Sequence, residues 1–260
     1  MVAGPIRTSD YGIDTPFFFR LMRGQIPHHK TILRSGRNPD VDVGAQESLW
    51  PQGGLYMFPP AASVMTASSS SANDAAAGTG ARTLLVSGLD ANYDEIQEVV
   101  ALNGQTPVNT VNTFLRIWTL AILSAGSGET QAGTIYIGTG AVVAGVPANI
   151  YNLCEIGFNN SQAIQWTVPR DYTAFLVQVN ASTSQSATNQ FTELSLRSRS
   201  LGGVFFRGSN IVIGGQSVDF EVPVPRMFAE KTDIDAMAVT SDVNILCTGI
   251  LRYVYIKNFY

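Results

Sequence analysis

The sequence has little charge. Only 14% of its 260 residues are charged, against about 25% in an average soluble domain. Because depletion of charge marks the centres of protein interfaces, this composition favours a protein that assembles with others. The net charge of −4 argues against nucleic acid as a partner, since proteins of that class are held on phosphate by basic surfaces.

Cysteine and histidine are scarce. Cys154 and Cys247 lie far apart without a Cys-x-x-Cys spacing, so we expect buried free thiols and neither a zinc site nor a disulfide. His28 and His29 are the only histidines. A catalytic histidine needs a third group that fixes its ring, and adjacent side chains in extended chain point opposite ways, which disfavours a metal pair.

Motifs for cofactors and membranes are also missing. The sequence contains no nucleophile elbow, no phosphate-binding loop and no dinucleotide-binding glycine pattern, so we expect no cofactor. No apolar run approaches the roughly 18 residues of a membrane span, and no charged-then-apolar leader opens the chain. We therefore expect a soluble protein that makes no membrane contact.

Two groups of carboxylates are the remaining candidates for chemistry: Asp90, Asp94, Glu95 and Glu98, then Glu230, Asp233 and Asp235. Paired carboxylates could hydrolyse a glycoside, and several together could hold calcium. Neither group has the spacing of a known metal loop, so solvated turns are favoured. Arg197 and Arg199 could form a basic patch, but in a strand they share one face, and we expect them to pair with acidic residues of a neighbour.

The first 50 residues differ from the rest. Prolines and glycines interrupt them, and no strand or helix period persists. Up to Arg37 this segment carries a net charge of +4, which leaves −8 for the remainder. Three consecutive phenylalanines, Phe17 to Phe19, are unlike ordinary disorder. We predict an extended arm over residues 1–50 that docks on a neighbouring copy.

Residues 51–260 read as a β body, formed of one sandwich or of two small ones. From Arg82 onward, apolar and polar residues alternate in short runs separated by turns, which predicts an all-β fold of the β-sandwich or jelly-roll-like kind. Asn103-Gly104 predicts a tight hairpin that returns the chain into Val108. The run from Val243 to Ile256 is apolar on both faces, so we expect a central strand or one pressed into an interface. β-branched residues argue against a helix over residues 90–100.

Several segments resemble a group of virion structural proteins of tailed bacteriophages. The similar segments span about residues 36 to 240 and include Gly36-Arg37-Asn38-Pro39-Asp40-Val41, Gly78-Thr79-Gly80-Ala81-Arg82-Thr83, Gly88-Leu89-Asp90-Ala91-Asn92-Tyr93, Leu102-Asn103-Gly104-Gln105-Thr106 and Glu230-Lys231-Thr232-Asp233-Ile234-Asp235. The pattern identifies the group more than a function. Arg170-Asp171 departs from the pattern, because relatives often have a small residue and glycine at this turn.

The resemblance implies a non-enzymatic virion protein. The prediction is a capsid decoration or cement protein on the capsid exterior, assembled in the host cytoplasm. Its expected partners are the major capsid protein and itself, as a dimer or trimer. The expected partner-binding residues are aromatic anchors and arginines of the arm, because aromatic side chains and arginine dominate interface energy: Phe17, Phe18, Phe19, Arg20, Arg23, Arg34, Arg37 and Trp50.

Two alternatives remain. A tail-associated or receptor-binding protein would use the same β body and stack exposed aromatic residues such as Tyr93, Trp118 or Tyr151 on a ligand. An enzyme that degrades host polysaccharide would use the acidic groups, although the repeats expected of a tailspike are missing from the sequence.

Overall fold

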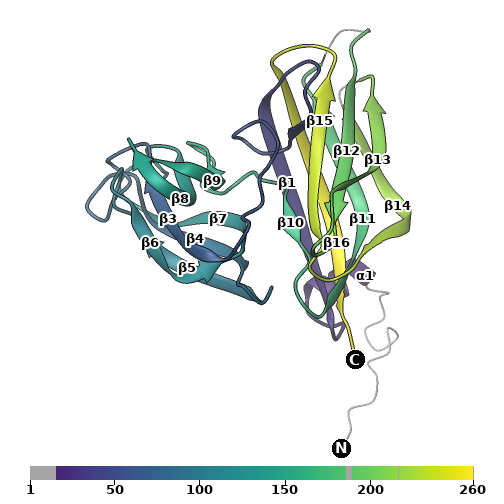
Figure 1. Cartoon of the computed structure of the whole chain (residues 1–260), viewed down its shortest axis with the longest axis horizontal. Helices are drawn as coiled ribbons and strands as arrows, with labels where there is room; N and C mark the ends of the chain where they lie inside the picture. Colours follow the sequence, from purple (N-terminus) through teal and green to yellow (C-terminus); the bar gives the residue numbers. More distant parts are fainter. Residues whose placement is uncertain (1–15, 186–188, 216, 260) are drawn as a thin grey trace, which may run out of the picture.

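The computed structural model describes residues 16–185, 189–215 and 217–259. Of these residues, 58% lie in strands and 3% in helix, so the predicted all-β fold is confirmed. The chain forms two lobes that lie side by side (Figure 1). We call them the large sandwich and the inserted lobe, because the second is built from residues between two strands of the first.

The large sandwich consists of two antiparallel sheets. Sheet A has the order β1 (His29–Val41), β16 (Ile245–Lys257), β11 (Tyr172–Thr183) and β14 (Ser217–Phe228). Sheet B has the order β10 (Trp166–Thr167), β15 (Asp233–Thr240), β12 (Thr192–Arg199) and β13 (Phe206–Ile213), and β2 (Glu47–Ser48) also pairs with β15. Apolar side chains from both sheets fill one core, which includes Trp166, Tyr253 and Leu251.

The inserted lobe follows β2 and precedes β10 in the chain. Its first sheet has the order β6 (Val108–Phe114), β3 (Ser63–Ser69), β8 (Ile135–Val143) and β9 (Val146–Cys154). Its second sheet has the order β5 (Glu95–Ala101), β4 (Ala81–Leu89) and β7 (Arg116–Ala125). A separate apolar core fills this lobe, with Phe114, Met65 and Leu84 fully buried. The β body predicted over residues 51–260 thus contains two separate cores, and β1 and β2 from the predicted arm belong to the large sandwich.

The inserted lobe packs against the side of the large sandwich that carries β1 and β10 (Figure 1). Trp118 and Leu89 of the inserted lobe belong to the core of the large sandwich, and the rings of Trp118 and Trp166 lie 6.4 Å apart. The opposite side of the large sandwich, formed by β13 and β14, faces away from the inserted lobe (Figure 1).

The predicted arm is corrected over most of its length. Its first fifteen residues lie outside the described part of the chain. Phe17–Met22 form the short helix α1, and His29–Val41 form β1, which pairs with β16 along its length. The ladder is irregular between Asn38 and Val41, where Pro39 lies, as expected for a residue without an N–H group on an edge strand. Gly36 permits close packing, since a Cβ there would lie 2.4 Å from the carbonyl oxygen of Leu49.

Four local predictions can be compared with the structure. β16 is central in sheet A, as its apolar character on both faces predicted, and residues 95–101 form a strand and not a helix. Gly104 adopts the expected positive φ of 61°. The predicted hairpin is nevertheless wrong, because β5 and β6 on either side of this turn pair within different sheets. Cys154 and Cys247 are buried free thiols, as expected.

Candidate interaction surface

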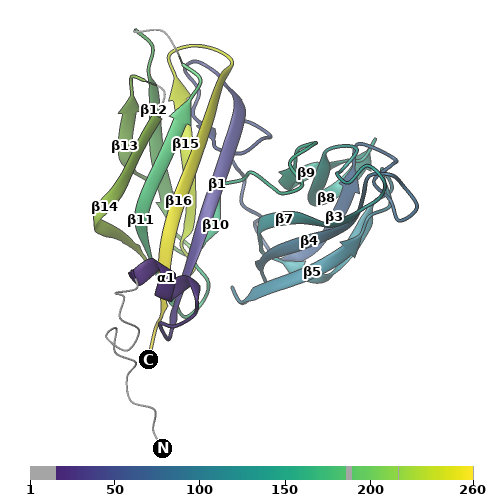
Figure 2. The same ribbon diagram turned by 180° about the vertical axis from the view of Figure 1, so that it is seen from behind.

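Helix α1 lies against the outer face of sheet A, near one end of β11 and β16 (Figure 2). Its Leu21 is buried. Val254 of β16 alternates with core residues and so points to the outer face, on which α1 lies (Figure 2), and it is buried there. The guanidinium of Arg252, also on β16, lies 5.4 Å from the ring centroid of Phe18. These contacts hold α1 on its own chain.

The opposite side of α1 is apolar and exposed. The side chains of Phe17, Phe19 and Met22 are 49%, 61% and 75% exposed. Arg23 is exposed and Arg20 is half-buried, and within the described part of the chain neither forms an ion pair. We call these five residues the helical patch. A cluster of large exposed apolar side chains bordered by cations has the composition of an interaction surface.

Arg34 lies elsewhere, although the sequence predicted it as a partner-binding residue. It is buried at the junction of the lobes, where its Nη2 donates to the carbonyl oxygens of Trp118 and Ala163 and its Nη1 donates to Thr119 Oγ1 at 2.9 Å. Burial lowers the pKa of Arg34 to about 10. The side chain therefore joins the lobes and offers no surface to a partner. Trp118, which the tail alternative needs on an exposed loop, is buried in β7.

Arg37 and Trp50 also make internal contacts. Arg37 Nη1 binds Glu155 Oε2 at 2.7 Å, which ties β1 to the segment after β9. Trp50 is buried, and its Nε1 donates to the carbonyl oxygen of Gly53 at 2.8 Å. Of the eight predicted partner-binding residues, five lie together in or next to α1: Phe17, Phe18, Phe19, Arg20 and Arg23. The other three, Arg34, Arg37 and Trp50, make contacts within the chain.

Asp233 and Asp235 of the second acidic group are buried among arginines, whereas Glu230 is half-buried and accepts the backbone N–H of Asp171 at 2.6 Å. Asp235 accepts hydrogen bonds from Ser48 Oγ at 2.6 Å, Gln165 Nε2 at 2.7 Å and Arg197 Nε at 2.9 Å. Burial raises the pKa of Asp235, and Arg197 counteracts that rise. Asp233 pairs in the same way with Arg199 at 2.9 Å. The neighbour that the sequence suggested for Arg197 and Arg199 is thus strand β15 of the same chain.

The first acidic group connects the lobes or fixes turns. Asp94 binds Arg170 at 2.8 Å, and Glu95 binds Lys30. Glu98 accepts the backbone N–H groups of two β6 residues, at 2.7 and 2.8 Å. Over the described ranges, no group of three His, Cys, Asp or Glu side chains is placed to hold a metal ion.

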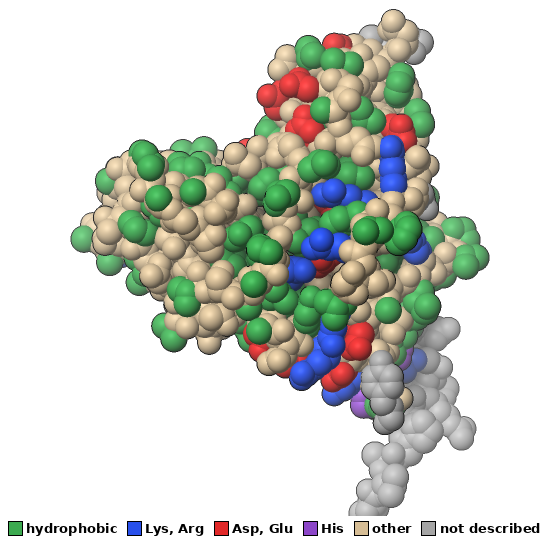
Figure 3. Space-filling model, in the orientation of Figure 1, with side chains coloured by type: hydrophobic (Ala, Val, Ile, Leu, Met, Phe, Trp, Pro, Cys, Tyr) green, Lys and Arg blue, Asp and Glu red, His purple; other side chains and the backbone are tan. Residues whose placement is uncertain are grey.

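Charge is distributed unevenly over the surface. Residues 63–154, which span the strands of the inserted lobe, include only eight charged residues. The face of this lobe in Figure 3 is almost free of charged side chains, whereas blue arginine and lysine side chains gather at the junction and on the large sandwich. No helix in the described part of the chain is long and apolar enough to span a membrane.

No protein family and no curated protein matches this sequence. Among solved structures, the chain is similar to the VP2 subviral particle of infectious bursal disease virus, with 11% identity, coverage of 94% of this chain and 78% of that one, and a TM-score of 0.22. The structure of the Gx strain of this virus is similar with 9% identity, coverage of 94% of this chain and 77% of that one, and a TM-score of 0.22. TM-scores this low carry no argument, so the function is argued below from the residues of this chain.

Proposed function

We propose that this chain is a non-enzymatic virion structural protein, and specifically a capsid decoration or cement protein of a tailed bacteriophage. The observation that carries the proposal is the helical patch. Its exposed phenylalanines provide apolar area, and Arg20 and Arg23 provide cations that have no counter-ion among the described residues. Such a patch is suited to a partner with an apolar depression and acidic rim, the role assigned here to the major capsid protein.

The construction of α1 supports this assignment. A helix of six residues is too short to be stable alone, so its shape depends on Leu21 and Phe18 packing on sheet A. The exposed side chains are therefore held in place before a partner arrives, which lowers the entropy lost on binding. Cement action then follows from mass action, because binding only the expanded shell stabilises that state and many copies act together.

The low charge of the inserted lobe supports a second contact. Exposed apolar side chains, including Val111 on β6 and Val143 on β8, lie on a surface otherwise made of small polar residues. Surfaces depleted of charge resemble the centres of protein interfaces. We propose that this lobe contributes to self-association on the capsid exterior, as a dimer or trimer.

Co-sedimentation with purified capsids that lack this chain tests the helical patch. We expect the double substitution Phe17→Ala/Phe19→Ala to weaken capsid binding at least ten-fold, since two aromatic anchors are each worth about 1 kcal/mol or more. Phe206→Ala is the matched control, because Phe206 is 69% exposed on β13, away from the patch. Equal binding by the double variant and the wild type would remove the patch from the proposal.

The number of copies per virion tests the location. Quantitative mass spectrometry of purified virions should give a ratio to the major capsid protein near one or a simple fraction such as one third. A ratio of a few per cent would instead place the chain in the tail, and would favour a tail-associated or receptor-binding role.

A further inference from the structure

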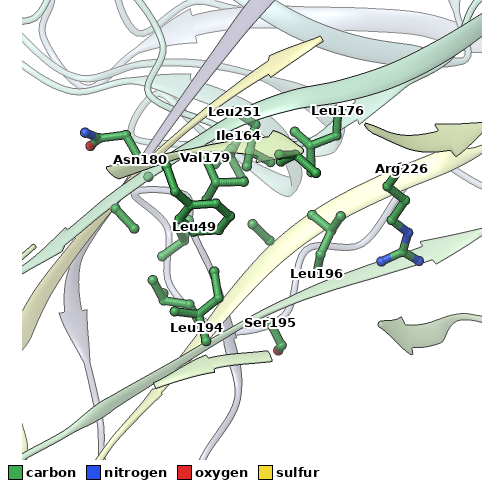
Figure 4. Close-up of a pocket in the computed structure, with 16 residues that line it drawn as sticks. Leu49, Ile164, Leu176, Val179, Asn180, Leu194, Ser195, Leu196, Arg226 and Leu251 are labelled. Carbon is green, nitrogen blue, oxygen red and sulfur yellow. The ribbon is translucent and has the colours of Figure 1, made fainter. Parts of the chain in front are cut away.

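An apolar cavity of about 150 Å³ lies between sheets A and B of the large sandwich (Figure 4). Its walls include Leu176 and Val179 of β11 and Leu194 and Leu196 of β12. Phe220 of β14 also lines the cavity and is 39% exposed, so the cavity reaches the surface beside β14. Cavities of this size with such walls stay free of water and take up apolar molecules about as large as benzene.

The path of β14 explains the opening. Leu176 of β11 pairs with Arg226 of β14, and Gln178 pairs with Glu221. Between these two pairs β14 advances five residues, whereas β11 advances two. Two residues of this segment are prolines, which have no N–H group for the ladder. Val224 between them is 84% exposed. β14 therefore bows out from the sheet at the side of the large sandwich that the inserted lobe leaves open.

Arg226 is the one charged side chain among the described residues that line the cavity. Figure 4 shows it at one end, extending from β14 toward the strand that carries Leu196. Its guanidinium stacks on Phe228 at 5.0 Å, and Nη2 donates to Ser198 Oγ at 3.3 Å. No carboxylate of the described chain lies within ion-pair distance of it.

Gly208 of β13 provides space for this guanidinium. A Cβ at that position would lie 2.0 Å from Arg226 Nη1. The backbone of Gly208 does not have a positive φ, so glycine is needed there for space and not for conformation. The guanidinium is thus held by the shape of its surroundings at the end of an apolar cavity, with no anion from the described part of its own chain.

We propose that this cavity binds a small amphiphilic monocarboxylate, with a short alkyl chain or single ring between the sheets and its carboxylate on Arg226. Guanidinium groups hold carboxylates through paired charge-assisted hydrogen bonds, and the only other polar side chains of the described lining, Asn180 and Ser195, carry no charge. This site is separate from the helical patch and does not depend on the proposed role in the virion.

Calorimetric titration of the full chain with hexanoate and with 1-hexanol tests the proposal. Both probes offer the same alkyl length, but only hexanoate has an anion. We expect hexanoate to bind one to one, about ten-fold or more tightly than 1-hexanol, as a charge-assisted hydrogen bond predicts. Arg226→Met should abolish that preference and leave 1-hexanol binding within about two-fold of the wild type.

Arg252→Met is the matched control. Arg252 also stacks on a phenylalanine and forms no ion pair within the described chain, but it lies on the outer face of sheet A, so this substitution should leave both affinities unchanged. Ala181→Leu, which fills the cavity, should remove binding of both probes. Should that variant unfold, Val222→Phe at the rim replaces it.

Three results would overturn the proposal. The first is no binding of hexanoate at millimolar concentration, and the second is equal affinity for hexanoate and 1-hexanol. The third is sedimentation that shows self-association of the wild type but not of the filled variant, since the cavity would then hold a side chain of a second copy.

Discussion

Asp233 joins the lobes through a buried ion pair, and Asp233→Asn is expected to lower the free energy of unfolding by about 3–5 kcal/mol. Asp233 accepts from Arg116 Nε at 2.8 Å and Nη2 at 2.9 Å, from Arg199 Nε at 2.9 Å and from Thr167 Oγ1 at 2.6 Å. The side chains of Arg116 and Asp233 are only 8% and 4% exposed. Removing the carboxylate charge therefore leaves the buried guanidinium of Arg116 without a counter-ion. The new amide N–H₂ group of the asparagine would also face N–H or O–H groups that donate to the carboxylate in the wild type.

The two arginine substitutions should cost less, in a defined order. Arg116→Met leaves Asp233 with Arg199 and Thr167, so its expected cost is about 2–3 kcal/mol, mostly from stranded hydrogen-bond acceptors. Arg199 is 31% exposed, and water screens its charge. Arg199→Met should therefore cost about 1 kcal/mol or less.

Urea unfolding followed by tryptophan fluorescence measures this order, because Trp118 and Trp166 lie together where the lobes meet. Arg207→Met is the control, since its pair with Glu193 is exposed, and it should change stability by less than about 1 kcal/mol. Equal losses for Asp233→Asn and Arg199→Met, or a loss below about 1 kcal/mol for Asp233→Asn, would refute the reasoning.

Three further predictions concern packing and ionisation. Gly36→Ala should lower the free energy of unfolding by about 1–3 kcal/mol in the same urea assay, because its Cβ would meet the backbone carbonyl of Leu49 at 2.4 Å. Burial raises the pKa of Cys154 and Cys247 to about 11 from 9.0, so neither should react with a disulfide reagent at pH 8 until urea is added. Since unfolded thiols ionise first, stability should fall as pH rises from 9.0 to about 11, as thermal unfolding at each pH would show.

Individual strands could be predicted from the sequence where the pattern of apolar residues lies within the strand itself. The β-branched run at residues 95–101 and the doubly apolar run that became β16 were both interpreted correctly, because each pattern depends only on neighbouring residues. β1 was missed for a physical reason. Its buried positions include Arg34, Gly36 and Asn38, which face the lobe junction and close contacts, so the apolar alternation of a half-buried strand is missing.

Long-range pairing could not be predicted. The turn at Asn103-Gly104 has the conformation that its residues favour, but whether the flanking strands pair together depends on β4 and β3, which compete for them. The same limit applies to the predicted partner-binding residues. Arg34 and Trp50 look like free anchors in sequence. In the folded chain Arg34 meets Trp118 and Ala163, far away in sequence, and Trp50 packs with Tyr56 and Ala163.

The arginines separate structural from interaction roles. Arginines with internal carboxylate partners join strands or lobes, and they are Arg37, Arg116, Arg170, Arg197, Arg199 and Arg207. Arg20 and Arg23 beside the exposed phenylalanines, and Arg226 at the apolar cavity, lack such partners within the described chain. Arg20 and Arg23 lie next to the exposed apolar side chains of α1, and Arg226 lies next to the apolar walls of the cavity. Because guanidinium binds carboxylates well, an external anion would gain most at these three arginines. Arg34 and Arg252 also lack a carboxylate partner within the described chain, but carbonyl oxygens hold Arg34 and the ring of Phe18 covers Arg252.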